Sequence, residues 1–442
     1  MNKLFLLCLW FSPLVGTAQT VLERYVEQGL QSNDGLRQKS VQLESALLAL
    51  REARTQFLPS ASLQANYFLA GGGRTVDFPA GDLLNPVYAT LNQLTGSQAF
   101  PQLENASILL NPDNFYDLKL HITFPLLNAE LNYQQRIRNK AISAQQAAVE
   151  VYRRELRKEI QQAYYRYLQA KAAEGIYASA VSLAEEGLRV NEALQRNGKA
   201  TPTSVSRSRS ELSRYRAEAE AARMQSRKAM LYFNFLLNRP GDSTLETDSS
   251  LVELPVTRPL VAGMREELAQ LRSARDIQAE MTRMAGAYRI PRFNAFVDVG
   301  SQAFDWQFND KSRYYFAGFA LQWDLFSSGK NRYRQQLARL EEKNLSIRYD
   351  ELGRQLELQQ QQAQLSLEAK RAQYLASKEY SSAAERGFND LNRQYQQGTL
   401  LQIELLDARN QWVQARLQEN LLLYDCWIAF AEAERAAATL QP

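Results

Sequence analysis

Two long helical runs without proline, residues 129–195 and 330–396, place the strongest limit on how this chain can fold. At about 1.5 Å per residue, each run predicts a rod of roughly 100 Å, which needs partners along its sides. Identical residues recur 200 positions apart in and around these runs: Ala163 and Ala363, Ala172 and Ala372, Gly187 and Gly387, Gly198 and Gly398, Arg209 and Arg409. This self-similarity predicts an internal duplication.

The duplication predicts two repeats with the same order of elements: a helix, a pair of strands, a long helix, a tip and a second helix. The first repeat spans residues 19–240 and the second residues 261–442, joined by a polar linker at 241–260. A loop at about 71–114, rich in Gly and Pro, is peculiar to the first repeat. We expect strands at about 61–70 and 115–124, a long helix at 129–195, a tip at 196–203 and a helix at 202–238 in the first repeat, and strands at about 292–301 and 314–324, a long helix at 330–396, a tip at 395–407 and a helix at 400–438 in the second.

Four segments alternate between apolar and polar residues, most clearly from Phe115 to Phe124. Strands of about ten residues with one apolar face are typical of transmembrane β-barrels. Four strands cannot close a barrel, and open strand edges are not tolerated in lipid, so several copies of the chain must pool their strands. Three copies would supply about twelve strands, an even number within the range of such barrels. We therefore predict an α+β membrane protein in which a trimeric, 12-stranded β-barrel is extended by a barrel of α-helices.

The first residues have the pattern of a secretory signal peptide. Lys3 precedes the apolar run from Leu4 to Val15, and small residues end at Ala18, where cleavage is expected. A retained anchor helix is the alternative, which the shortness of the run disfavours. Cys8 lies within residues 1–18 and too early to carry an acyl chain, so no N-terminal lipidation is expected. Cys426 is then alone in the mature chain, which excludes an intrachain disulfide.

Composition and motifs argue against several classes of function. A formal net charge of +4 gives no basis for nucleic acid binding, and 23% charged residues exclude a bundle of membrane helices. No nucleophile lies at a suggestive spacing from a base, so we do not expect an enzyme. His121 is interpreted as a lumen or loop residue, because no cluster of Cys or carboxylates accompanies it as a metal site would require. Neither a metal nor another cofactor is expected.

The turn between the two long helices of each repeat has stop and start signals. Gly198 and Gly398 are suited to end a helix in the left-handed conformation. Thr201, which precedes a proline, predicts the start of the next helix in the first repeat. In the second repeat Thr399 is the predicted cap, and Gln402 would complete a capping box.

The segment Tyr395-Gln-Gln-Gly-Thr399, followed by Glu404-Leu-Leu-Asp407-Ala, resembles the tip of the TolC-like outer-membrane factors of Gram-negative tripartite efflux and type I secretion systems. With the duplicated order of elements, the resemblance covers nearly the whole mature chain. It implies a homotrimer in the outer membrane, in contact with its lipid, with a 12-stranded barrel and a long periplasmic α-barrel. It also implies that the tips close the periplasmic entrance and open when a periplasmic adaptor protein docks, with an inner-membrane pump beyond it.

The resemblance also assigns roles to single residues. Tyr395 corresponds to the gate tyrosine, and Glu404 and Asp407 correspond to the acidic pore constriction. A gate arginine of such channels is replaced here by Leu400, so the resemblance does not extend to its salt-bridge latch. In the first tip, Ser204 stands where the family often has Asp. The tip residues in contact with the adaptor would be Gly198, Lys199, Gly398, Thr399, Leu400 and Leu401.

Glu404 and Asp407 allow two interpretations from the residues alone. Three positions apart, they share one face of a helix. In a symmetric trimer they would form two stacked rings of carboxylates, a constriction that favours cations. The spacing fits equally well two acidic residues that stabilise the positive end of a helix dipole. The resemblance favours the rings.

The predicted function is a passive exit duct of a tripartite efflux system, gated at the helical tips. An outer-membrane channel for type I protein secretion is an alternative with the same architecture and a polypeptide cargo. A secreted coiled-coil structural protein is an alternative of another class, which the alternating strands disfavour.

Overall fold

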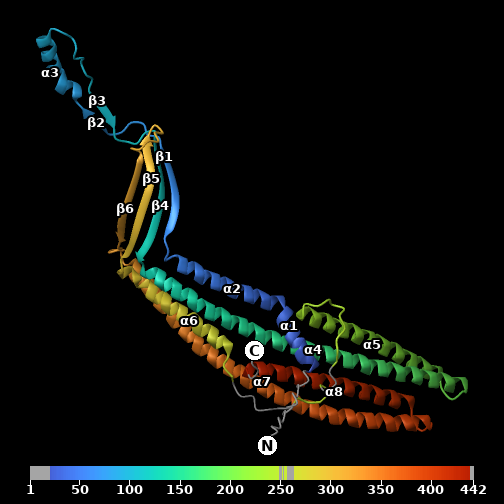
Figure 1. Ribbon diagram of the computed structural model, residues 1–442. Helices are drawn as coiled ribbons and strands as arrows, with labels where there is room; N and C mark the ends of the chain where they lie inside the picture. The colour runs from blue at the N-terminus through green and yellow to red at the C-terminus, as the bar shows by residue number, and fades with distance from the viewer. Residues whose placement is uncertain (1–19, 248–250, 252, 256–262, 439–442) are drawn as a thin grey trace, which may run out of the picture. The chain divides into compact units, whose positions relative to one another are not determined.

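The computed structural model describes residues 20–247, 251, 253–255 and 263–438. The predicted signal peptide at 1–18 and part of the predicted linker lie outside these residues. The chain divides into two compact units, whose elements are labelled in Figure 1. The sheet unit comprises Leu47–Asn139 and Ile277–Glu342. The helical unit comprises the described parts of Met1–Ala46, Lys140–Asp276 and Lys343–Pro442.

Four antiparallel strands in the order β1-β4-β5-β6 form the main sheet. The pairing of β4 with β5 joins the two repeats, so that Leu120 lies opposite Val299, and β1 and β6 are left as the edges. The strands are β1 (Ser60–Phe68), β4 (Phe115–Leu127), β5 (Arg292–Phe304) and β6 (Arg313–Gln322). The four-stranded sheet and the long helical hairpins confirm the predicted α+β fold.

The two faces of this sheet differ in chemistry, because successive side chains of a strand point to opposite sides. On one face, polar side chains of different strands pair: His121 of β4 pairs with Asp298 of the neighbouring β5, and Tyr314 Oη of β6 donates across β5 to Asp117 Oδ1 of β4 over 2.6 Å. The opposite face carries apolar side chains that no described residue covers, such as Phe319, which is 69% exposed. An outward apolar face and an inward polar face are what a membrane barrel requires.

Four helices continue these strands in the same order: α2 (Asp34–Thr55) before β1, α4 (Ala129–Arg196) after β4, α6 (Glu266–Ala285) with the 3₁₀ turn η2 (Ala287–Arg289) before β5, and α7 (Lys330–Gln396) after β6. Inside the sheet unit, Arg136 of α4 lies 3.9 Å from Glu280 of α6. Gln278 of α6 donates to the Ala338 carbonyl of α7 over 3.1 Å. Among the described residues, no helix is both long and apolar enough to cross a membrane.

Residues 69–114, which we call the arm, contain regular structure. β2 (Thr75–Phe78) pairs with β3 (Ala106–Leu109), and α3 (Ala80–Thr95) lies between them in the chain. The prediction of a loop at 71–114 was therefore wrong. The Gly and Pro content suggested a loop, but Pro86 lies inside α3, where its ring removes one helical hydrogen bond without ending the helix.

The segment before β1 also differs from the single helix that its composition suggests. It forms α1 (Val21–Ser32) and α2, which Asn33 separates with an extended backbone. Asn33 Nδ2 donates to the Leu236 carbonyl, 3.0 Å away at the end of α5 (Pro202–Leu236). The side chain thus satisfies a terminal helical carbonyl that would otherwise lack a partner.

The helical unit has its main core where α1, α4, α5 and α8 (Gln402–Ala437) meet. Tyr164 of α4, Phe233 of α5 and Cys426 of α8 are fully buried there. Burial raises the pKa of the Cys426 thiol to about 11, so this cysteine is a packing group and not a reactive one.

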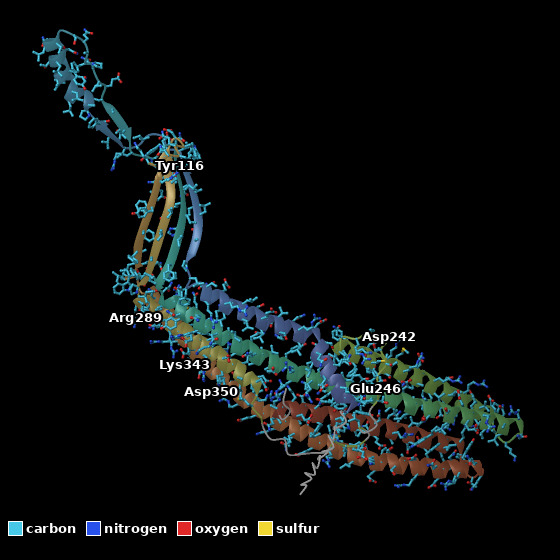
Figure 2. The ribbon with its side chains drawn as sticks, viewed as in Figure 1. Tyr116, Asp242, Glu246, Arg289, Lys343 and Asp350 are labelled. Atoms are coloured by element: carbon cyan, nitrogen blue, oxygen red, sulfur yellow. The ribbon has the colours of Figure 1, made fainter. Side chains whose placement is uncertain are left out.

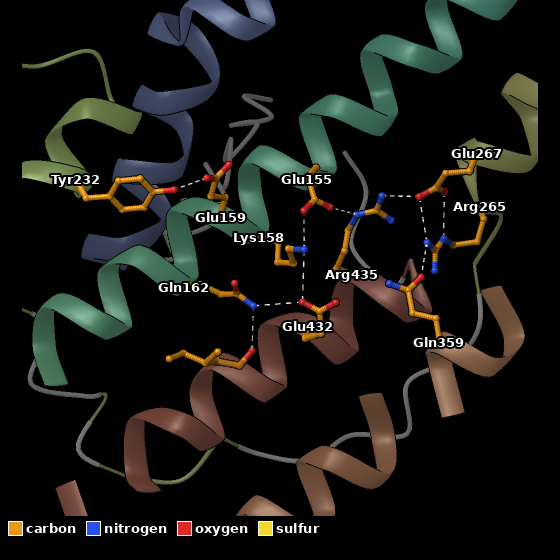
Figure 3. A network of polar contacts seen from close by, with 11 residues as sticks. Glu155, Lys158, Glu159, Gln162, Tyr232, Arg265, Glu267, Gln359, Glu432 and Arg435 are labelled. Carbon is orange, nitrogen blue, oxygen red and sulfur yellow. Dashed lines mark hydrogen bonds and ion pairs between the residues drawn. The ribbon is translucent and has the colours of Figure 1, made fainter. Parts of the chain in front are cut away.

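An ionic network ties α8 to α4 and to the segment that begins α6 (Figure 3). Glu267 accepts hydrogen bonds from Arg265 Nη2 at 3.0 Å and from Arg435 Nη2 at 2.5 Å. Arg265 Nη1 also donates to the Ala436 carbonyl at 2.6 Å, and Arg435 Nε lies 3.4 Å from Glu155 of α4. Burial by itself raises the pKa of Glu267, but the hydrogen bonds from both guanidinium groups outweigh it and hold the pKa at about 2.

Glu267→Gln should therefore destabilise the protein at about pH 6 and progressively less as the pH falls. A carboxyl whose folded-state pKa lies below its ordinary 4.5 contributes stability above 4.5 and loses it as the pH falls towards about 2. A shift of this size corresponds to about 3 kcal/mol. The measurement is the thermal loss of helical circular dichroism in detergent at about pH 6, 4 and 3. Glu220→Gln, at an exposed carboxylate of α5, is the control, and a destabilisation independent of pH would contradict the prediction.

Candidate functional site: the hairpin tips

Both hairpins turn at a glycine in the left-handed region. Gly198 has φ of +67° and Gly398 has φ of +77°, a conformation that glycine adopts without steric cost. In the first tip, Thr201 is the N-cap of α5, and its Oγ1 accepts from the Ser204 backbone N–H at 3.3 Å. Pro202 follows at the first helical position, where its missing N–H has no consequence.

The second tip starts its helix two residues later than predicted. α8 begins at Gln402 with Leu401 as N-cap, so the prediction that Thr399 caps it was wrong. Thr399 Oγ1 instead donates to the Gln394 carbonyl, 3.0 Å away at the end of α7. Glu404 takes the capping role from inside the first turn, where its Oε2 accepts from the Leu401 N–H at 3.2 Å.

Four polar side chains and one backbone carbonyl join the two hairpins just behind the tips. Tyr395 Oη donates to Asn191 Oδ1 at 2.6 Å, and Asn191 Nδ2 donates to Ser208 Oγ at 3.0 Å. Gln402 Nε2 donates to the same Ser208 Oγ at 2.8 Å and to the Ser204 carbonyl at 3.1 Å. Asn191 and Ser208 are each only 3% exposed. We call these five residues the tip latch, since they hold α7 and α8 against α4 and α5.

A buried ion pair joins the same hairpins about two helical turns further along α8. Arg409 Nη1 lies 3.4 Å from Glu211 Oε2 of α5, and both side chains are buried. Burial raises the pKa of Glu211, while the charges of Arg409 and Arg214 act in the opposite direction. A Cβ at Gly187 would lie 3.1 Å from Arg409 Nη2, so the glycine leaves room for the guanidinium.

Apolar packing surrounds the latch on the α7–α8 side. Phe388 and Trp412 stack with ring centroids 5.0 Å apart and an interplanar angle of 6°. Leu405 and Ala408 complete this cluster, and Tyr395 packs against it. The ring of Tyr395 is thus held by packing while its hydroxyl crosses to the other hairpin.

The structure separates the predicted gate residues. Tyr395 bonds across to α4, whereas Glu404 caps its own helix. Asp407 is exposed and accepts from Gln411 Nε2 at 2.8 Å. Glu404 is exposed as well, in the same turn as the buried Leu405. Of the predicted tip residues, Leu400 is half-buried, and the others are exposed: Gly198, Lys199, Gly398, Thr399 and Leu401.

Sequence reasoning missed Asn191 and the buried ion pair. Asn191 follows Ala180, Ala184 and Gly187 at alternating spacings of four and three residues, which marks the inward face of α4. That spacing could have identified it as a buried polar residue in need of a partner. Ser208, by contrast, lies in a serine-rich stretch in which no single serine stands out.

Comparisons with known proteins agree with this geometry. The family model described as Outer membrane efflux protein matches residues 260–438. The CmeC outer membrane channel of Campylobacter jejuni has a similar structure, with a TM-score of 0.75 and 15% identity over 95% of this chain and 86% of that chain. VceC of Vibrio cholerae has a TM-score of 0.74 and 16% identity, covering 95% of this chain and 96% of its own. The open-state MtrE channel of Neisseria gonorrhoeae has a TM-score of 0.75 and 16% identity, covering 95% and 89%. No curated protein sequence matches the chain.

The family match lies in the second repeat, and the structural matches extend over nearly the whole chain. The family whose model matches is a family of efflux proteins and not of enzymes. The predicted resemblance is confirmed: the second repeat matches the model of the outer membrane efflux proteins, and the chain has the fold of the TolC-like outer membrane channels.

Proposed function

We propose that the protein is the exit channel of a tripartite efflux system in the outer membrane of a Gram-negative bacterium. One observation carries the proposal: a single chain combines a four-stranded sheet that has two open edges with two long helical hairpins. The unpaired edges of β1 and β6 require partner strands in lipid, where water cannot satisfy them. Three copies that pair β6 of one with β1 of the next form a closed barrel of about twelve strands.

The helical tips gate this duct. In the closed state, the tip latch holds α7 and α8 against α4 and α5. Its hydrogen bonds join neutral groups, which contribute only about 0.5–1.5 kcal/mol each because water replaces them on opening. A periplasmic adaptor that binds the open tips more tightly than the closed ones supplies the free energy of opening.

The adaptor contacts the exposed tip residues and connects the channel to an inner-membrane pump. Lys199 and Leu401 protrude from the two tips as a charged and an apolar contact. Leu400 is half-buried against the apolar cluster, so it takes part in the packing of the tip. Because Leu400 cannot form an ion pair, the latch at the tips consists of neutral hydrogen bonds, and the ion pair of Arg409 with Glu211 lies about two helical turns behind it.

Glu404 and Asp407 form the acidic constriction. Both carboxylates are exposed in the single chain, and three copies bring them together as two stacked rings. The capping role of Glu404 is compatible with this second role, because only one of its oxygens accepts the Leu401 N–H. Solutes pass passively, and cations are favoured over anions at this point.

The assembly is tested by the mass of the full-length protein in mild detergent. Native mass spectrometry should give three times the protomer mass, since three copies are needed for strand closure. A monomer or dimer that retains its β-sheet by circular dichroism would contradict the proposed barrel.

The latch is tested by Tyr395→Phe combined with Gln402→Ala. These changes remove the two donors that cross between the hairpins, so the closed state should lose about 1–3 kcal/mol. The resting conductance in planar bilayers should rise about tenfold, as expected for a loss of ~1.4 kcal/mol. Tyr380→Phe, at an exposed tyrosine of α7, is the matched control. Equal resting conductance in variant and control would show that the latch does not hold the gate.

The acidic constriction is tested by Glu404→Gln combined with Asp407→Asn. The glutamine can still cap α8, so the fold of the tip is preserved. Without the carboxylates, the reversal potential under a salt gradient should move towards zero. Glu218→Gln with Glu220→Gln removes the same charge from the exposed face of α5 as a control. An unchanged cation preference would exclude these residues from the constriction.

A further inference from the structure

The arm, residues 69–114, exposes apolar surface that it cannot bury by itself. Its hairpin of β2 and β3 is exposed along both strands apart from the last residue of β3, and Gly81 is the only buried residue of α3. An isolated two-stranded hairpin is at best marginally stable in water, and so is a single helix of 16 residues. The arm therefore needs a partner surface.

One side of α3 already has its partners within the arm. Asn85 pairs with both backbone groups of Leu103, at 2.7 and 2.9 Å. Asn92 does the same with Phe100, at 3.0 and 2.7 Å, and Tyr88 packs against the Phe100 ring. These contacts fix the polar stripe of the helix against the segment that returns to β3. The apolar stripe on the other side of α3 takes no part in these contacts.

That opposite stripe has the spacing of a coiled coil. Leu84, Val87, Leu91 and Leu94 follow one another at intervals of three, four and three residues, which is the a-d-a-d pattern. With Leu83 they occupy an arc of about 100° on the helix. Val87 is 51% exposed and Leu94 is 79% exposed. A leucine seam of this kind packs against another helix with the same seam.

The lack of basic residues in the arm favours a second copy of the chain, and not a membrane surface, as the partner of this stripe. Residues 75–118 contain no Lys or Arg, and residues 83–103 contain no charged side chain at all. Helices that lie on anionic lipid have a basic polar face, which α3 lacks. Without charges beside the seam, copies of α3 can approach one another without repulsion.

The arm leaves the sheet at a rigid point. It connects β1 to β4, and Figure 2 labels Tyr116 at the start of β4, where the chain returns from the arm. Tyr116 Oη donates to the Gln307 carbonyl at 3.0 Å, and its ring stacks on Trp306 with centroids 5.6 Å apart. In the trimer of the proposed function, three arms therefore start from the same rim of the barrel.

We propose that the α3 helices of three copies pack through this leucine seam into a short bundle at the mouth of the barrel opposite the helical tips. The inference rests on the trimer of the proposed function. It assigns the arm to assembly at the mouth of the barrel and gives the apolar stripe a defined occupant, the α3 helices of the other copies.

The test is cross-linking between copies in the full-length protein, in a background with Cys8→Ala and Cys426→Ala. Leu94→Cys, in the seam, is treated with a short bismaleimide, and the matched control is Ala89→Cys, exposed on the opposite side of α3. Leu94→Cys should give a band at twice the protomer mass with at least about ten times the yield of the control, because one reagent joins two of three neighbouring helices. Adding Leu84→Asp to Leu94→Cys should lower this yield at least about tenfold while the trimer mass in detergent is retained.

The outcomes separate this inference from the proposed function. A trimer in which Leu94→Cys and Ala89→Cys cross-link equally, or not at all, overturns the bundle and leaves the channel intact, and the seam then contacts lipid or another protein. Loss of the trimer in the parent protein overturns both. Cross-linking that persists unchanged with Leu84→Asp also overturns the bundle.

Discussion

The open edges of the main sheet are the constraint on which the rest of the structure depends. On their outer sides, β1 and β6 each present a row of backbone donors and acceptors that have no strand partner among the described residues. Each such group left unsatisfied in lipid costs several kcal/mol, so the sheet is stable in a membrane only as part of a closed barrel. The strand order places the first repeat at one edge and the second at the other. Closure therefore brings the first repeat of one copy against the second repeat of its neighbour.

The order of the strands continues in the helices that flank them along the chain. Each strand is followed or preceded by its own helix, and the polar contacts run between adjacent helices, as between Arg136 and Glu280. Because the helices carry mainly polar and small residues, their walls tolerate water on both sides, whereas the sheet has one mainly apolar face. The chain passes from helix to strand within a few residues of Pro59 and Pro291.

The polar interactions of the helical unit differ in strength according to their position. Around Glu267, two guanidinium groups bind one carboxylate, which is among the stronger arrangements a protein has. At the tips, the latch consists of hydrogen bonds between neutral groups, each of which exchanges with water at little net cost. The ion pairs, including that of Arg409 with Glu211, thus lie behind the latch, and the tips themselves are joined by weaker contacts, which is the distribution that a gate at the tips requires.

The sequence by itself determined the duplication, the four strands, the long helices and the two glycine turns, since these follow from periodicity and local conformation. It also marked Tyr395, because a motif of consecutive residues carries it. Only the tertiary structure decided the partners. Arg209 and Arg409 occupy equivalent positions, yet Arg209 lies on the surface beside Glu192 and Arg409 is buried with Glu211. The start of α8, the partner of Tyr395 and the helix inside the arm were likewise undetermined. Each depends on side chains brought together from segments distant in the chain, and local patterns contain no information about which distant neighbour is present.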